Sequence, residues 1–192
     1  MFEFIQNQYD DVMKINLIKI NIVIIYLLLI TTGIFAQQKE FGIRGGINQS
    51  RKEFTELHFY EIYMLTDFPI DLIKEDSSSP LKISLETSAG LLQDDITNSA
   101  IFSSGPVFLL NTLQKNISLS GGISPSLMTK HKFKNLDLGC SFNFVSHIEL
   151  MFSPIDKISL GYRFEHISNA GIYKNNPGVN MHFLQIKSIG WK

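Results

Sequence analysis

The sequence has very little cysteine and almost no net charge, and each shortage excludes a class of protein. Its single cysteine, Cys140, excludes an internal disulfide and any multi-cysteine metal site. A formal net charge of −1 gives no basis for nucleic-acid binding. The histidines lack the HExxH spacing, and no glycine-rich phosphate loop is present. We therefore expect no metal, no cofactor and no nucleic-acid partner.

The N-terminus has the pattern of a secretory signal peptide over residues 1–36. Lys14 and Lys19 precede an unbroken apolar run, and Ala36 offers a small residue for cleavage. The run is shorter than the ~20 apolar residues that a spanning helix needs, and no later stretch reaches that length. We interpret residues 1–12 as an upstream extension before a start at Met13. Residues 37–192 are then expected to form one outer-membrane β-barrel domain.

The rest of the chain alternates apolar and polar residues, which is typical of β-strands. Its 15 Phe and 6 Tyr suit interior packing or the aromatic girdles of a membrane barrel. An exported chain of this kind is either a soluble periplasmic β-sandwich or an outer-membrane barrel. We predict the second, an all-β, eight-stranded antiparallel transmembrane β-barrel. The expected strands are residues 40–48, 55–68, 81–92, 99–111, 116–123, 136–152, 157–168 and 179–191.

His166 and Ser168 lie two residues apart near the end of the seventh expected strand. Alternate side chains of a strand share a face, so the two project the same way, about 6.5 Å apart along the strand. This is the minimum arrangement for a histidine that acts as base to a serine nucleophile. The pair falls on the same face of the strand as its apolar residues, whereas Arg163 and Glu165 fall on the other face. We therefore expect the pair outside the barrel, facing lipid, and Glu165 inside, in a buried ion pair with Arg163 or another interior cation.

A longer motif, H-x-S-N-A-G followed by N-P-G, contains this pair. It resembles the PagL-type outer-membrane lipid A 3-O-deacylases, also called acyloxyacyl hydrolases. The resemblance is confined to the last thirty residues, and upstream only a general barrel pattern matches. The residues that carry it are His166, Ser168, Asn169, Ala170, Gly171, Asn176, Pro177 and Gly178.

The resemblance implies a role for each site residue. Ser168 would attack an ester of lipid A, and His166 would take its proton. Hairpin pairing sets Asn180 opposite His166, where the family usually has a glutamate. An amide oxygen can orient the ring but offers no full charge to an imidazolium. Asn169 and nearby backbone N–H groups would hold the oxyanion.

Basic residues gather in two expected loops on the same side of the barrel as the motif. The phosphates of lipid A are partners that fit them by charge, and a solvated loop is the alternative interpretation. The implied partners are lipid A, lipopolysaccharide and other lipids of the outer membrane of a Gram-negative bacterium. The residues concerned are Arg51, Lys52, Lys130, Lys132 and Lys134.

Two functions remain open from the sequence. The first is a serine esterase, a lipid A 3-O-deacylase acting in the outer leaflet. The second is a non-catalytic small outer-membrane barrel with a structural or adhesive role, which Asn180 favours because it replaces a carboxylate. The discriminating observation is whether His166 and Ser168 come within hydrogen-bond reach of each other on the lipid face, with Asn180 beside the ring.

Overall fold

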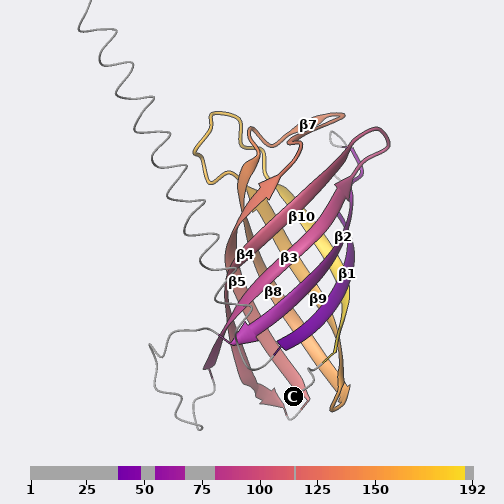
Figure 1. The fold of residues 1–192 in the computed structure, drawn as a ribbon, viewed down its shortest axis with the longest axis vertical. Helices are drawn as coiled ribbons and strands as arrows, with labels where there is room; N and C mark the ends of the chain where they lie inside the picture. Colours follow the sequence, from indigo (N-terminus) through magenta and orange to yellow (C-terminus); the bar gives the residue numbers. More distant parts are fainter. Residues whose placement is uncertain (1–38, 49–54, 68–80, 115, 189–192) are drawn as a thin grey trace, which may run out of the picture.

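Eight antiparallel strands form a closed barrel in the order β1-β10-β9-β8-β5-β4-β3-β2 (Figure 1). The computed structural model describes residues 39–48, 55–67, 81–114 and 116–188. The predicted signal peptide, Arg51 and Lys52 lie outside the described residues. The barrel strands are β1 (Lys39–Asn48), β2 (His58–Asp67), β3 (Leu81–Gln93), β4 (Asn98–Gln114), β5 (Ile117–Met128), β8 (Phe142–Ile155), β9 (Ile158–Ser168) and β10 (Val179–Ser188).

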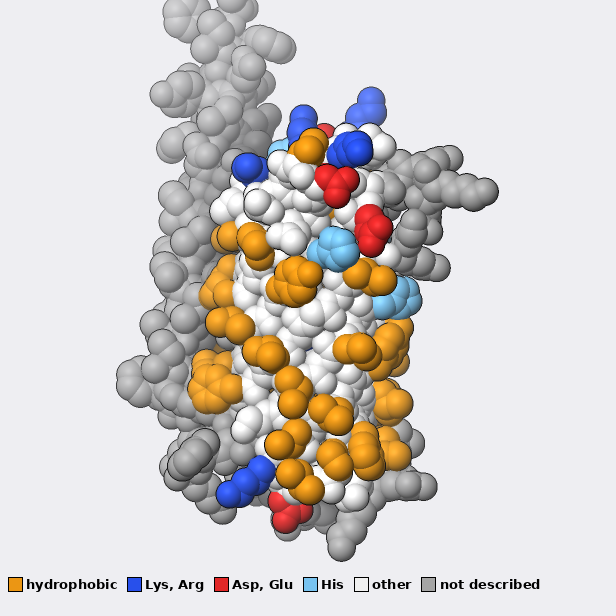
Figure 2. Space-filling view, turned by 90° about the vertical axis from the view of Figure 1, so that its right-hand side faces the viewer, with side chains coloured by type: hydrophobic (Ala, Val, Ile, Leu, Met, Phe, Trp, Pro, Cys, Tyr) orange, Lys and Arg blue, Asp and Glu red, His pale blue; other side chains and the backbone are white. Residues whose placement is uncertain are grey.

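The prediction of an all-β, eight-stranded antiparallel barrel of the outer-membrane type is confirmed. The outer wall carries exposed apolar side chains on every flank, among them Ile43, Phe108, Ile148 and Leu184. Figure 2 shows hydrophobic side chains over the middle of the barrel and charged ones gathered at its two ends. Such an apolar band is the surface that a barrel presents to lipid.

The interior is layered along the barrel axis. The layer nearest β6 (Lys132–Phe133) and β7 (Leu136–Asp137) is an apolar plug, in which Phe59 and Phe183 meet edge to face at 5.5 Å. The next layer is ionic, and there the predicted Arg163–Glu165 pair forms at 2.9 Å. The plug contains Leu57, Phe59, Leu92, Ile101, Met128, Phe133, Leu136, Leu138, Val145, Ile167, Val179, Met181 and Phe183.

One predicted strand, residues 136–152, is wrong in its first part. Leu136 belongs instead to a short β6–β7 hairpin above one end of the barrel, and the barrel strand begins at Phe142 (Figure 1). Gly139 has φ 86°, which ends the strand, and its N–H donates to the Asp137 carboxylate at 2.8 Å. Leu138 is buried in the plug. The alternation at 136–140 therefore reflects a folded loop, because the loop too has one buried side.

The fifth strand is longer than predicted. It runs to Met128, through Pro125, rather than ending at residue 123. Its inward positions include Ser124 and Ser126, which are small and polar, so the segment lacks the apolar alternation by which it could be recognised.

In the part of the chain that the structure describes, no α-helix has the length and hydropathy needed to cross a bilayer.

Candidate active site

The end of β9 carries both residues of the predicted pair. Side chains alternate along this strand, and Arg163, Glu165 and Ile167 are buried inside the barrel. His166 and Ser168 are half-buried and share parity with the exposed side chains of the same strand. The two residues therefore lie on the outer face of the wall, at the end of the barrel near β6 and β7.

Asn180 holds the His166 ring from the neighbouring strand. In the antiparallel register of β9 and β10, the two residues are directly opposite each other. The Oδ1 of Asn180 lies 2.7 Å from Nδ1 of His166. An amide oxygen only accepts, so Nδ1–H donates to it and Nε2 keeps its lone pair. This is the form of imidazole that a general base needs.

Gly178 has no side chain, which leaves room beside Cε1 and Nε2 of the His166 ring. The β9–β10 register, continued by one pair, sets it opposite Ser168. Its φ is 63°, and a Cβ built there would lie 2.7 Å from Cε1 and 3.1 Å from Nε2 of His166. Among the described residues, the Ser168 hydroxyl has no hydrogen-bond partner, so the hydrogen bond between His166 and Ser168 that would discriminate the two functions is not formed in this structure. Both residues lie on the lipid-facing side of the wall.

Asn169 anchors the turn at residues 169–178, here called the site turn. Its side chain is 0% exposed. The amide Nδ2 donates to the carbonyls of Leu138 at 3.0 Å and Asn175 at 2.7 Å. Its Oδ1 accepts from the Gly171 N–H at 3.0 Å. Both amide hydrogens are committed to the backbone, so in this arrangement the Asn169 side chain positions the turn and is not directed at an oxyanion.

Two other donors in the site turn have no partner among the described residues. One is the backbone N–H of Ala170, which has φ 53°. The other is the Nδ2 of Asn176, whose Oδ1 accepts from the Asn169 N–H at 3.0 Å. From the sequence, Asn176 and Gly178 are members of the motif with no role of their own. That membership is the signal by which a role in the site could have been predicted.

The β6–β7 hairpin supports the site turn from its side. Asn175 Nδ2 donates to the Asp137 carbonyl at 2.9 Å, next to the Asn169–Leu138 bond. The Gly139 N–H lowers the pKa of the Asp137 carboxyl below its ordinary value, and His131 adds to this effect. The hairpin is thus held by a carboxylate that is favoured in its charged form.

The predicted basic residues that the structure describes lie at this same end of the barrel. Lys130, Lys132 and Lys134 are all exposed. Lys132 lies 3.4 Å from an Asp137 oxygen, and Lys134 lies 4.0 Å from Asp95. Two of the three lysines therefore have acidic neighbours within the chain, which weakens their case as phosphate ligands and leaves Lys130 as the better candidate.

A second polar pair lies on the outer face of the same two strands. The hydroxyl of Tyr162 is hydrogen-bonded to Nδ1 of His182 at 2.6 Å, and the ring of Phe164 contacts His182 at 5.3 Å between centroids. His182 is two residues beyond Asn180 and shares its face. Because Nδ1 of His182 is hydrogen-bonded to Tyr162, His182 does not take the place of Asn180 beside the His166 ring.

Comparisons with known proteins agree with this architecture. The family model described as lipid A 3-O-deacylase (PagL) matches residues 60–187. A "Lipid A deacylase PagL" of Bordetella bronchiseptica is 33% identical over 63 residues, which is 33% of this chain and 35% of the relative. That alignment spans only about a third of the relative's length.

A solved structure shows the same fold. The crystal structure of the outer membrane enzyme PagL superposes with a TM-score of 0.62 at 20% identity, covering 78% of this chain and 99% of that one. Neisserial surface protein A gives a TM-score of 0.48 at 9% identity, covering 80% and 96%. Because the family model matches most of the chain, the protein belongs to the lipid A 3-O-deacylase (PagL) family.

Proposed function

We propose that this protein is a lipid A 3-O-deacylase, a serine esterase that removes an ester-linked acyl chain from lipid A. The observation that carries the proposal is the His166 ring, held through Nδ1 by Asn180 on the lipid-facing side of the wall. Ser168 follows two residues later on the same face. Family membership and the name of the Bordetella relative both support lipid A as substrate.

The chemistry follows from the free nitrogen of His166. Ser168 Oγ attacks the ester carbonyl carbon while Nε2 takes the hydroxyl proton. The carbonyl oxygen gains negative charge, which the unpartnered N–H groups of Ala170 and Asn176 are available to stabilise. His166 then gives its proton to the sugar oxygen as the ester bond breaks. Water, activated by the same nitrogen, releases the fatty acid and restores Ser168.

The position of the site suits a lipid substrate. The protein is an outer-membrane barrel, and we take the end with β6 and β7 as extracellular because both ends of the described chain lie at the opposite end. The pair then faces the outer leaflet at the level of the lipid head groups. An ester of lipid A can reach Ser168 from the membrane without entering the barrel, whose plug closes the interior.

A lipophilic fluorophosphonate tests the nucleophile directly on the folded protein in detergent. Reaction requires a serine activated by a neighbouring base, so we expect one label, at Ser168, in the wild type. Ser168→Ala and His166→Ala should remain unlabelled while keeping the heat-modifiable mobility of a folded barrel. A folded wild-type barrel without label, or equal labelling of His166→Ala, would contradict the assignment.

Two observations favour the alternative, a non-catalytic barrel with a structural or adhesive role. The Ser168 hydroxyl makes no hydrogen bond with His166 in this structure. Asn180 cannot offer a negative charge to the imidazolium that forms when His166 takes the proton. If that charge is indispensable, the wild type will not react with the probe and Asn180→Glu will. The two functions are therefore separated by the same experiment.

A further inference from the structure

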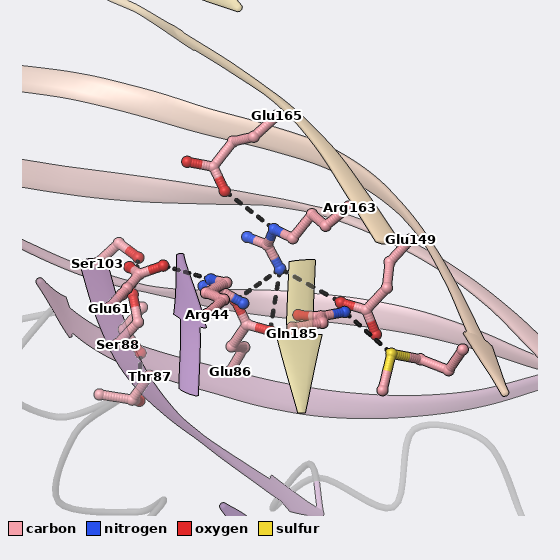
Figure 3. A network of polar contacts seen from close by, with 12 residues as sticks. Arg44, Glu61, Glu86, Thr87, Ser88, Ser103, Glu149, Arg163, Glu165 and Gln185 are labelled. Atoms are coloured by element: carbon pink, nitrogen blue, oxygen red, sulfur yellow. Dashed lines mark hydrogen bonds and ion pairs between the residues drawn. The ribbon is translucent and has the colours of Figure 1, made fainter. Parts of the chain in front are cut away.

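The ionic layer inside the barrel holds more acidic than basic groups. Figure 3 shows its members, all buried, which are Arg44, Glu61, Glu86, Glu149, Arg163 and Glu165. Four carboxyl groups face two guanidinium groups, so the acidic groups outnumber the basic ones by two. Lys187 is engaged with Glu40 at 2.8 Å nearer the barrel mouth, and Lys82 also has an interaction of its own. An uncompensated buried charge is strongly destabilising.

His147 indicates where positive charge would fit. Its side chain is 8% exposed, and neither ring nitrogen has a hydrogen-bond partner among the described residues. Ligand atoms of Glu86, His147 and Glu149 all lie within 4.8 Å of one another. Buried polar groups are nearly always paired, so an unpartnered imidazole requires an explanation. Imidazole nitrogen with two carboxylate oxygens is a ligand set that proteins use for Zn²⁺.

Two glycines of the barrel wall lie beside these ligands. Gly105 of β4 pairs with Glu86, and Gly122 of β5 pairs with His147. A Cβ built at Gly122 would lie 2.8 Å from Cε1 of His147. Since Gly122 projects no side chain, the imidazole can lie against β5, near the carboxylates of Glu86 and Glu149.

Arg163 holds the two carboxylates without covering them. Its Nη1 lies 3.0 Å and 3.1 Å from the two oxygens of Glu86, and 3.7 Å from Oε2 of Glu149. A carboxylate has about four lone-pair positions, so each retains sites for an ion. Carboxylates that ligate metals are commonly held by such outer partners.

A small cavity leads to the acidic ligands from the end of the barrel where the described chain begins and ends. Its volume is about 30 Å³, and its lining includes Glu86, Glu149, Ser120 and Lys187. This is enough space for one water molecule or ion. The cavity connects the two carboxylates with the Glu40–Lys187 mouth, which offers an entry path.

We propose that Glu86, His147 and Glu149 bind one divalent transition-metal ion, with Zn²⁺ the best match to the ligand chemistry. The ion would compensate the excess of acidic over basic groups in the ionic layer and stabilise the barrel. Modest side-chain rotations would bring the ligand atoms to the spacing of about 3.4 Å that tetrahedral zinc bonds of 2.0–2.2 Å require. The site lies inside the wall, so it is independent of the ester chemistry outside.

The test uses untagged, folded full-length protein in detergent, stripped with EDTA and then dialysed against Zn²⁺. We expect one Zn²⁺ per chain by elemental analysis and a rise of several degrees in the temperature at which the barrel unfolds. Co²⁺ in place of Zn²⁺ should give the visible absorption of a low-symmetry nitrogen–oxygen site. His147→Gln should bind Zn²⁺ at least tenfold more weakly and lose the thermal shift.

His131→Gln is the matched control, because His131 lies beside a carboxylate, 2.9 Å from Asp137, but is partly exposed and belongs to the segment of the β6–β7 hairpin outside the barrel. It should bind Zn²⁺ like the wild type. If His147→Gln fails to fold, Glu149→Gln and the Co²⁺ spectrum of the wild type answer the same question. Absence of stoichiometric Zn²⁺ in the wild type, or equal binding by His147→Gln, would overturn the proposal.

Discussion

Gly178 is the residue that most closely limits the geometry of the base. Two glycines of the site turn have positive φ, Gly171 at 76° and Gly178 at 63°, so both avoid the strain that a side chain brings there. Only Gly178 approaches the His166 ring, because nothing lies within 4 Å of a Cβ built at Gly171. The two positions therefore separate backbone strain from displacement of the base.

Gly178→Ala should lower the rate of ester hydrolysis about 10- to 100-fold, because a shift of the ring by a fraction of an ångström misaligns Nε2 with Ser168. Gly171→Ala introduces similar backbone strain without touching the ring, and strain of this kind acts mainly on stability. Its rate should stay close to the wild-type value. Initial rates on purified lipid A, with folding checked by heat-modifiable mobility, measure both. Equal loss in the two variants would show that the contact with His166 is irrelevant.

Asn180 sets the tautomer of His166 but supplies no charge. Asn180→Glu should raise kcat about tenfold, since a hydrogen bond to a charged group can add the ~1.4 kcal/mol that a tenfold change requires. Asn180→Leu should lower kcat because Nδ1 loses its acceptor. Steady-state rates of the three proteins at neutral pH provide the comparison. Identical rates for wild type and Asn180→Leu would mean that Asn180 does not orient the base.

At the scale of elements, the site depends on a contact that sequence reasoning could not supply. The pairing of β9 with β10 was predictable, because the Asn, Gly and Pro residues of the motif mark a turn between two alternating segments. The packing of the β6–β7 hairpin against the site turn was not. It rests on side-chain bonds to backbone carbonyls, such as Asn169 to Leu138, between segments 31 positions apart. Nothing in local alternation distinguishes such a loop from a strand.

The β6–β7 hairpin should loosen in acid. The pKa of Asp137 is lowered by the Gly139 N–H and by His131, so its stabilising effect is present above its ordinary value of 3.8 and is lost as pH falls through the lowered pKa. Amide protection factors at residues 131–141, corrected for intrinsic exchange, should therefore fall below about pH 4.

Asp137→Asn provides the control for this pH dependence. The asparagine can still accept from Gly139 but does not titrate. Part of the pH dependence should remain, because Asp94 also accepts the Lys134 N–H in this region at 2.8 Å. Burial alone would raise the pKa of Asp94, but this bond and the N–H groups of Ile96 and Thr97 lower it. Unchanged protection of the wild type down to pH 3 would contradict the account.

At the scale of the whole molecule, strand parity predicted which side chains face inward, but not how they pair across the lumen. Arg163 and Glu165 share a strand, and their pairing was foreseen. Arg163 also lies 3.0 Å from Glu86, which is 77 positions away. Arg44 likewise bridges Glu61 on the next strand and Glu86 beyond it. These contacts depend on closure of the barrel, which no local pattern encodes.

Arg163→Met should destabilise the barrel by about 3–5 kcal/mol, because it leaves buried carboxylates without their cation. The exposed ion pair of Lys134 and Asp95, at 4.0 Å, offers the comparison. Lys134→Met should change stability by no more than ~0.5 kcal/mol. Urea titrations that follow the folded fraction by gel mobility measure both. Equal stability of Arg163→Met and wild type would contradict a structural role for the ionic layer.

The central claim is that His166 and Ser168 act on lipid A from the outer face of the barrel. Mass spectrometry of lipid A from cells that express the protein, beside cells that express Ser168→Ala, tests it most directly. The account predicts loss of one ester-linked acyl chain in the wild type only, with both barrels present in the outer membrane. Identical lipid A in the two strains would contradict it.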